Sequence, residues 1–446
     1  MRRILYGLII TTIALLPAAL RAQEATVLTL EDAMNYAVKN NATSKNARLD
    51  ILIQQAKNAE ITGLALPNIS GKGEFTDYIN PIQSFVPGEF IGQPGKFVAV
   101  PFTPKYTSTA SISGSQVLFD GSVMVALQAR NAVLKLMEQS ARLSEEDVRY
   151  NVQKAYYSLV IAKQQFGILV NTIGYARSIT NEMEAMYGEG FIEKIEVDRL
   201  RVSLNNLKSD SIRIGNMIDV SEQLLKYRMG MPIETPIVLT DTSVSDKVDE
   251  ATALLASELE YANRTEYNLL QSQLTLNKYD LKRHKLSGIP SLAAFGTVAY
   301  NYSTNTFKDL FKEQYIFYSL VGLQLNVPIF DGLQRRNRVK QAKLSVEKTQ
   351  NSIEDLKLGI DFQEKSAKTN LRNSILAMNN EKNNMELAMS VLETARKKYQ
   401  AGVGSNLEVS QAQTEALLAQ TNYFNAMLDM INAKSDLQKA LGQFKQ

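Results

Sequence analysis

Two long stretches of the chain are polar on average but carry apolar residues at regular intervals. In residues 334–399 these positions lie close to a heptad spacing, at Val339, Ala342, Val346, Ile353, Leu356, Ile360, Ala367 and Leu371. Apolar heptads of this kind form the seam of a coiled coil. Residues 122–187 and 334–399 are therefore predicted as two coiled-coil helices of 66 residues, each ~100 Å long at ~1.5 Å per residue.

Four shorter stretches are also predicted as helices, at about 30–65, 193–229, 250–287 and 405–443. All four have similar lengths, and two of them placed end to end match the span of one long helix. The chain would then supply four helical columns of similar length, namely the two long helices and two end-to-end pairs of shorter ones. This arrangement favours the wall of a tube over a closed bundle.

Four segments between the helices alternate polar and apolar residues, which is typical of strands. In residues 106–117, one face carries Thr107, Thr109, Ser111, Ser113 and Ser115, and the other carries Tyr106, Ala110 and Ile112. In residues 317–327, the apolar series is Val321, Leu323 and Leu325, and it alternates with Gly322, Gln324 and Asn326. Residues 69–78 and 291–302 alternate more weakly.

All four segments have the ~10 to 12 residues that a tilted strand needs to cross a bilayer. An ordinary two-sided sheet of a soluble domain is the alternative. The joining segments, 79–105 and 303–314, are expected to be long, irregular loops on one side of the sheet, which favours membrane strands.

A turn motif occurs twice, with the same internal spacing. "YGEGFIEKIEVDRLR" (Tyr187–Arg201) and "YQAGVGSNLEVSQAQ" (Tyr399–Gln413) are related by an offset of 212 (399 minus 187). "FDG" recurs at Phe119–Gly121 and Phe330–Gly332, an offset of 211 (330 minus 119). The chain is therefore predicted to be a tandem duplication. Residues 23–230 form the first repeat, residues 231–249 a linker and residues 250–446 the second repeat.

The N-terminus has the form of a secretory signal peptide. Arg2 and Arg3 precede the apolar run Ile4–Leu20, and small residues lead to an expected cleavage site after Ala22. A transmembrane anchor is the alternative, but the run is short and is followed by polar sequence. Residues 1–22 are thus expected to be removed.

Composition excludes several classes of protein. Cleavage removes three arginines and leaves 46 basic against 46 acidic residues, so the mature chain lacks the positive excess of a nucleic-acid-binding protein. Without cysteine, it has no disulfide, no acylated N-terminus and no thiolate metal site. The single histidine, His284, is expected to be solvated. No catalytic residue, cofactor or metal site is predicted, so the chain is not expected to be an enzyme.

Four strands cannot close a barrel, and an open sheet edge in lipid would leave backbone groups without hydrogen bonds. The chain is therefore expected to oligomerise. Two copies give eight strands, whose side chains fill the interior, whereas three copies give twelve strands and leave a lumen. A homotrimer is the smallest assembly that makes a channel.

The duplication, the "FDG" before each long helix and the "Y-x-x-G" turns resemble the TolC-like outer membrane efflux proteins over nearly the whole mature chain. The resemblance implies a mixed α and β membrane protein, with a trimeric 12-stranded β-barrel in outer membrane lipid and a periplasmic α-barrel. Residues 231–249 and the C-terminus would form an equatorial belt. It also implies a passive exit duct, coupled to an inner-membrane pump through a periplasmic adaptor.

The resemblance makes each glycine-bearing turn the periplasmic tip of a helical hairpin. We name Gly188–Glu193 the first tip and Gly402–Ser405 the second tip. Their glycines, Gly188, Gly190, Gly402 and Gly404, are expected to permit positive φ at the turns. Both tips are predicted to dock the adaptor.

The resemblance also indicates which residues lie at the pore entrance. Tyr399 matches a tyrosine that helps to close the entrance in relatives, and Glu196 and Glu408 occupy equivalent positions where carboxylates are expected. Gly404 and Gln411 stand where relatives have an arginine and a second acidic ring, so this chain departs from the family's closed-state lock. For Glu408 an alternative is a capping box with Ser405 in "SNLE".

A periplasmic coiled-coil scaffold or adaptor without a pore of its own is the alternative function. Such a protein would need no strands of bilayer length and would usually have one hairpin. The sequence leaves the cargo open among drugs, metal ions and proteins.

Overall fold

The computed structural model describes residues 26–241, 244, 247–311 and 315–444, so the predicted signal peptide at residues 1–22 lies outside the described residues. The chain divides into two compact units. The first contains the described part of Met1–Arg48, with Ala141–Thr265 and Lys357–Gln446; the second contains Leu49–Ser140 and Glu266–Leu356. Each unit therefore draws on both halves of the sequence.

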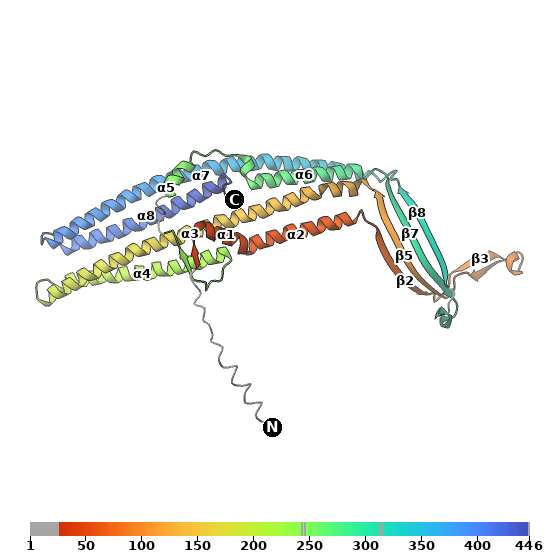
Figure 1. The fold of residues 1–446 in the computed structure, drawn as a ribbon, viewed down its shortest axis with the longest axis horizontal. Coiled ribbons are helices and arrows are strands. Elements are labelled where there is room, and N and C mark those ends of the chain that lie inside the picture. Colours follow the sequence, from red (N-terminus) through yellow and green to blue (C-terminus); the bar gives the residue numbers. More distant parts are fainter. Residues whose placement is uncertain (1–25, 242–243, 245–246, 312–314, 445–446) are drawn as a thin grey trace, which may run out of the picture. The chain divides into compact units, whose positions relative to one another are not determined.

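The two longest helices are α3 (Gly121–Gly188) and α7 (Gln334–Gln400), and the bounds of both lie within one residue of the prediction. The predicted seam of α7 is confirmed, because Ala342, Ile353, Ile360, Ala367 and Leu371 are all buried. In the first unit, α4 (Lys194–Met229) runs back alongside α3, and α8 (Asn406–Ala440) runs back alongside α7 (Figure 1). These are two helical hairpins, which we call the first hairpin and the second hairpin.

The prediction of one helix at 30–65 is wrong, because the chain forms α1 (Leu30–Asn40) and α2 (Ala42–Gly63). Asn41 separates them with extended backbone, φ −62° and ψ 138°. Its side chain accepts a hydrogen bond from the backbone N–H of Thr43 (2.8 Å) and donates one to the backbone oxygen of Arg228 (2.8 Å). The first contact caps the start of α2, and the second joins the break to the end of α4.

The single helix predicted at 250–287 is also wrong. The chain forms α5 (Lys247–Leu254), a 3₁₀ turn (Tyr261–Asn263) and α6 (Thr265–Leu286). Arg264, before α6, is buried, and its guanidinium donates to the backbone oxygen of Ala440 (2.8 Å). This contact fixes the break by joining it to the end of α8.

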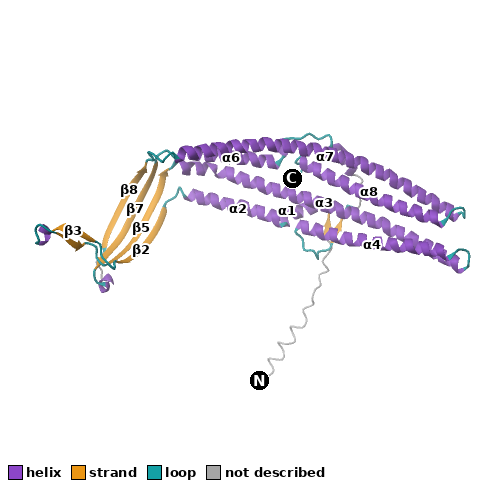
Figure 2. Cartoon of the chain, turned by 180° about the vertical axis from the view of Figure 1, so that it is seen from behind, coloured by secondary structure: helices purple, strands orange, loops and turns teal. Residues whose placement is uncertain are grey.

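The second unit contains one antiparallel sheet with the strand order β2-β5-β7-β8. Its strands lie side by side in Figure 2 and are β2 (Asn68–Asp77), β5 (Tyr106–Phe119), β7 (Ser291–Thr304) and β8 (Ile316–Asn326). Four strands are thus present where four were predicted. Within the described part of the chain, neither β2 nor β8 pairs along its outer edge.

Residues 79–105 were predicted to be an irregular loop, and this is wrong for part of the segment. It contains the hairpin of β3 (Gln83–Pro87) and β4 (Phe97–Pro101), joined through a 3₁₀ turn (Gly88–Ile91). Glycines with positive φ, Gly92 (76°) and Gly95 (81°), reverse the chain between the two strands. The corresponding segment of the second repeat has a 3₁₀ turn, Phe307–Phe311.

The core of the first unit gathers where β1 (Thr26–Leu28) pairs in parallel with β6 (Ile237–Leu239), inside the predicted linker. Tyr156 of α3 is fully buried there and donates to the backbone oxygen of Leu28 (3.2 Å). Lys434 of α8 forms an ion pair with Glu250 of α5. The first contact joins β1 to the first hairpin, and the second joins α5 to the second hairpin. Among the described residues, no helix is long and apolar enough to cross a membrane.

The same order of elements occurs twice, as α2-β2-β5-α3-α4 and as α6-β7-β8-α7-α8. Backbone geometry repeats with it. Gly190 and Gly402 have φ 80° and 75°, and Gly230 and Gly442 have φ 69° and 70°. Both pairs are related by the offset of the turn motif, since 402 minus 190 and 442 minus 230 each give 212.

Candidate functional site

Each tip is formed by a Schellman motif, a turn in which two backbone hydrogen bonds close the end of a helix around a left-handed residue. At the first tip, Gly190 donates to the oxygen of Tyr187 (3.0 Å) and Phe191 to that of Met186 (2.9 Å). At the second tip, Gly402 donates to Tyr399 (3.0 Å) and Val403 to Lys398 (3.0 Å). The two tips are therefore the same turn, formed at equivalent positions of the two repeats.

The four predicted tip glycines play two different parts. Gly190 and Gly402 have positive φ, whereas Gly188 and Gly404 do not, so for these two the prediction is wrong. Gly404 is confined instead, because a Cβ there would lie 2.9 Å from the backbone nitrogen of Tyr399. A Cβ at Gly188, the last residue of α3, would have no heavy atom within 4 Å.

An apolar side chain projects from each tip, which the sequence reasoning did not single out. Phe191 is 76% exposed and Val403 is 77% exposed. They follow the left-handed glycine in each motif, and they too are equivalent in the two repeats (403 minus 191 is 212). At this position an apolar residue usually packs back onto the helix. Comparing the aligned tips would have revealed this shared apolar position.

Tyr399 lies between the two hairpins. Its ring packs against apolar residues of the first hairpin, and its hydroxyl donates to the sulfur of Met183 in α3 (2.6 Å). Burial raises the pKa of Tyr399, and the negative charges of Glu182 and Glu196 raise it further. The neutral phenol is therefore the favoured state of this contact.

Glu196, in the first turn of α4, is held by two donors. The side-chain amide of Asn406 donates to its carboxylate (3.0 Å) and to its backbone oxygen (3.1 Å), and Arg199 donates to the second carboxylate oxygen (3.1 Å). Asn406 is itself only 6% exposed. The bond therefore ties the first turn of α8 to the first turn of α4, and sequence reasoning missed Asn406.

Glu408 is exposed, unlike its repeat equivalent. Its backbone N–H donates to the hydroxyl of Ser405, the N-cap of α8 (3.2 Å), which is one half of the predicted capping box. At the start of α4, the N-cap residue Glu193 makes no such bond. The structure thus brings Tyr399 and Glu196 into the contact between the hairpins and leaves Glu408 on a free face.

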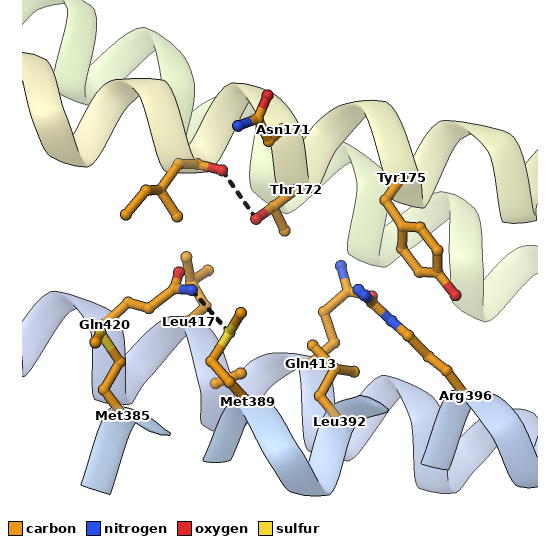
Figure 3. A pocket seen from close by; sticks show the side chains of 12 residues that line it. Asn171, Thr172, Tyr175, Met385, Met389, Leu392, Arg396, Gln413, Leu417 and Gln420 are labelled. Carbon is orange, nitrogen blue, oxygen red and sulfur yellow. Dashed lines mark hydrogen bonds between the residues drawn. The ribbon is translucent and has the colours of Figure 1, made fainter. Parts of the chain in front are cut away.

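A third contact between the hairpins borders a cavity of about 410 Å³ (Figure 3). The guanidinium of Arg396 in α7 lies over the ring of Tyr175 in α3, 3.4 Å from the ring centroid. Burial lowers the pKa of Arg396, while the neighbouring Tyr175 partly counteracts this effect. We call the contacts of Asn406, Tyr399 and Arg396 with the first hairpin the intrachain joint.

One face of the sheet of the second unit is largely polar in β2 and β5, whereas in β7 and β8 it also carries Phe295 and Leu320. Ser113 lies opposite Ser70 and Thr297, and its hydroxyl is 3.1 Å from that of Thr297. On the other face, the register places exposed apolar side chains in neighbouring rows, namely Ile69, Ile112, Val298, Tyr300, Phe317, Val321 and Leu323. This face is a continuous apolar surface.

No metal-binding group emerges from the described ranges, which contain no cluster of three or more His, Cys, Asp or Glu side chains that could hold an ion. His284, expected to be solvated, is half-buried, and its Nε2 lies 3.5 Å from a carboxylate oxygen of Asp280.

Comparisons with known proteins agree with one another. The family model described as "Outer membrane efflux protein" matches residues 287–443. The outer membrane protein TolC of Escherichia coli is 21% identical over 348 residues, covering 75% of this chain and 69% of TolC. The alkaline protease secretion protein AprF of Pseudomonas aeruginosa is 20% identical over 335 residues, with the same coverage of each chain.

Solved structures share the fold. The outer membrane protein VceC of Vibrio cholerae matches with a TM-score of 0.68 at 14% identity, over 93% of this chain and 96% of VceC. CusC, described as forming a transmembrane channel, matches with a TM-score of 0.69 at 15% identity, over 92% and 91%. The resemblance seen in the sequence is confirmed, because the family model, the curated relatives and the solved structures all point to TolC-like outer membrane efflux proteins. The predicted location, in the outer membrane and extending into the periplasm, agrees with these comparisons.

Proposed function

We propose that three copies of this chain form the outer membrane exit duct of a tripartite efflux or secretion system. The observation that carries the proposal is the four-stranded sheet, which has one continuous apolar face and unpaired outer edges in the described residues. Backbone groups at such edges find no water in a bilayer, so the sheet must be completed by further strands. Three copies supply twelve strands, enough to surround a lumen.

In this assembly the apolar face of the sheet contacts outer membrane lipid, and the polar face, with Ser111, Ser113 and Thr297, lines the lumen. The helices form an α-barrel in the periplasm. The repeated element order and the paired glycines at an offset of 212 support a tandem duplication. A trimer then presents six similar hairpins around one axis.

The duct is a passive conduit, coupled to an inner-membrane pump through a periplasmic adaptor that docks on the tips. Phe191 and Val403 support this role, because both tips present an exposed apolar side chain at the same position of the turn. In the proposed trimer six such side chains gather at one end, and a contiguous exposed apolar patch marks a protein contact site. The tip glycines shape the turns that carry them.

The tips also form the pore entrance. Tyr399 and Glu196 hold the two hairpins of one chain together, so they restrict how far the entrance can open. Glu408 lies at the equivalent position on the other hairpin and contributes its carboxylate to the contact between copies. The charge at the entrance is therefore largely paired.

Two measurements test the duct. Native mass measurement in mild detergent should give three chains, and the purified protein should conduct ions in planar bilayers. A stable monomer that forms pores would refute the trimer. Release from membranes without detergent, together with absent conductance, would favour the periplasmic scaffold.

A further inference from the structure

The second hairpin has an empty groove where the first hairpin has a filled one. In the first hairpin, Tyr399 packs against a socket formed by Ile179, Met183, Met186, Ile192, Val197 and Leu200. Adding 212 to these numbers gives Val391, Ala395, Lys398, Gly404, Val409 and Ala412. Four of these six, all but Gly404 and Val409, line a groove between α7 and α8, together with Glu408 and Glu415.

The repeat also identifies the side chain that fits this groove. Subtracting 212 from Tyr399 gives Tyr187, which lies in the last turn of α3 and is 45% exposed. We propose that Tyr187 of a second copy fills the groove of the second hairpin, as Tyr399 fills the socket of the first. The proposal rests on the proposed ring of copies and identifies the surface by which they join.

Polar residues along α8 show which side of each hairpin is covered. Asn406, Gln413 and Gln420 follow one another at seven-residue spacing, and all three are buried. Their equivalents in α4 are Lys194, Arg201 and Lys208, and these three are exposed. Charged side chains are rarely buried without a partner of opposite charge. The α4 row is therefore suited to an acidic surface.

That surface lies at the groove, where Glu408 and Glu415 are also seven residues apart and exposed. Within one chain, Asn406 contacts Glu196. The equivalent contact between copies joins Lys194 of one copy to Glu408 of the next. Arg201 and Glu415 follow one heptad further along, although Arg201 already contacts Glu184 in its own chain (2.8 Å).

The two kinds of joint differ in chemistry. In the intrachain joint the amide of Asn406 is bonded to the carboxylate of Glu196, whereas the equivalent contact between copies is an ion pair. Each copy contributes one surface to the copy before it and a different surface to the copy after it, an arrangement that closes into a ring when the rotation allows. Salt screens exposed ion pairs. High ionic strength should therefore loosen the joints between copies first.

The absence of cysteine permits a direct test with engineered pairs. Lys194→Cys with Glu408→Cys, treated in membranes with a short bis-maleimide, should give covalently linked trimers on denaturing gels. The matched control, Glu196→Cys with Asn406→Cys, should be linked within each chain and migrate as a monomer. Efficient linking of the control without links between copies for the first pair would overturn the proposal.

A charge exchange gives an independent readout. Lys194→Glu should raise the conductance of the entrance several-fold at a fixed salt concentration, and adding Glu408→Lys should restore the original conductance. A trimer that conducts normally but shows neither cross-links nor rescue would refute this interface and leave the duct intact. Cross-linked trimers without any conductance would support the interface and refute the duct.

Discussion

The side-chain amide of Asn406 in α8 reaches across to Glu196 in α4, and it donates to both the carboxylate (3.0 Å) and the backbone oxygen (3.1 Å). This single side chain joins the first turns of two helices that lie far apart in the sequence. With Arg199 on its other carboxylate oxygen, Glu196 is fully engaged within its own chain. The joint therefore determines the spacing of the two tips in one copy.

Asn406→Ala should loosen this joint. A hydrogen bond to a charged group contributes about 1.5–3 kcal/mol, and its loss leaves Glu196 with one donor fewer. We expect larger single-channel conductance and a lower melting temperature. Asn406→Asp should have a stronger effect, because it places two carboxylates together. Asn422→Ala, an exposed position on the same helix, is the control. Unchanged conductance in both Asn406 variants would contradict a role for the joint in the entrance.

The tip glycines should differ in their tolerance of a side chain. Gly190→Ala and Gly402→Ala force a Cβ into the left-handed region, at a cost of about 1–2 kcal/mol each. Gly404→Ala should be as harmful because of the nearby backbone of Tyr399. Gly188→Ala should be neutral, since the space around it is open. Export assays with trimer quantification would test this, and a defect in Gly188→Ala equal to the others would contradict it.

Phe191 and Val403 should be needed for adaptor docking. Phe191→Asp and Val403→Asp place a charge on each exposed apolar position and should abolish export, with the double variant the most severe. Because neither side chain is buried, trimer yield should stay unchanged. Cross-linking to the adaptor in cells measures the loss directly. If export persists in the double variant, docking lies elsewhere.

Alkaline pH should open the entrance through Tyr399. Burial, with the charges of Glu182 and Glu196, raises the pKa of this phenol above its unfolded value of about 10. Its contribution to stability is therefore fully present below pH of about 10 and is lost as pH rises through the folded value. Conductance should rise in this range, and Tyr399→Phe should shift the rise to higher pH. Tyr423→Phe, the control, should behave as the unaltered protein does.

The long helices and the strands could be predicted because their patterns are local and periodic. The heptads of α7 and the alternation of β5 each repeat over many residues, so the predicted bounds of both elements lie close to the observed ones. The breaks at Asn41 and Arg264 could not be predicted in the same way. Each is fixed by a contact with a residue at least 176 positions away, Arg228 and Ala440 respectively.

At the candidate site, the repeat identified the tips and the equivalence of Glu196 with Glu408. It could not distinguish their surroundings. Asn406 and Lys194 stand at equivalent positions, yet the first is buried against Glu196 and the second is exposed. Such differences arise when one hairpin packs on the other, and one chain contains that contact only once.

The strand register between copies can be predicted from the register within one copy. β5 corresponds to β8 at an offset of 211, from Phe119 and Phe330, and β2 corresponds to β7 at an offset of 223, from Pro67 and Pro290. Within the chain, Ser113 of β5 lies opposite Thr297 of β7. The equivalent residues are Gln324 (113 plus 211) and Glu74 (297 minus 223).

We therefore expect Gln324 of one copy to lie opposite Glu74 of the next, with both side chains on the polar face of the sheet. Residues opposite each other in antiparallel strands have Cα atoms about 4.5–5.5 Å apart, which suits a disulfide. Gln324→Cys with Glu74→Cys should give disulfide-linked trimers under mild oxidation. Leu323→Cys with Glu74→Cys is the matched control, because a shift of one residue places the thiols on opposite faces. Stronger linking in the control would show that the strands pair between copies in a different register, and no linking in either would show that β8 and β2 do not meet.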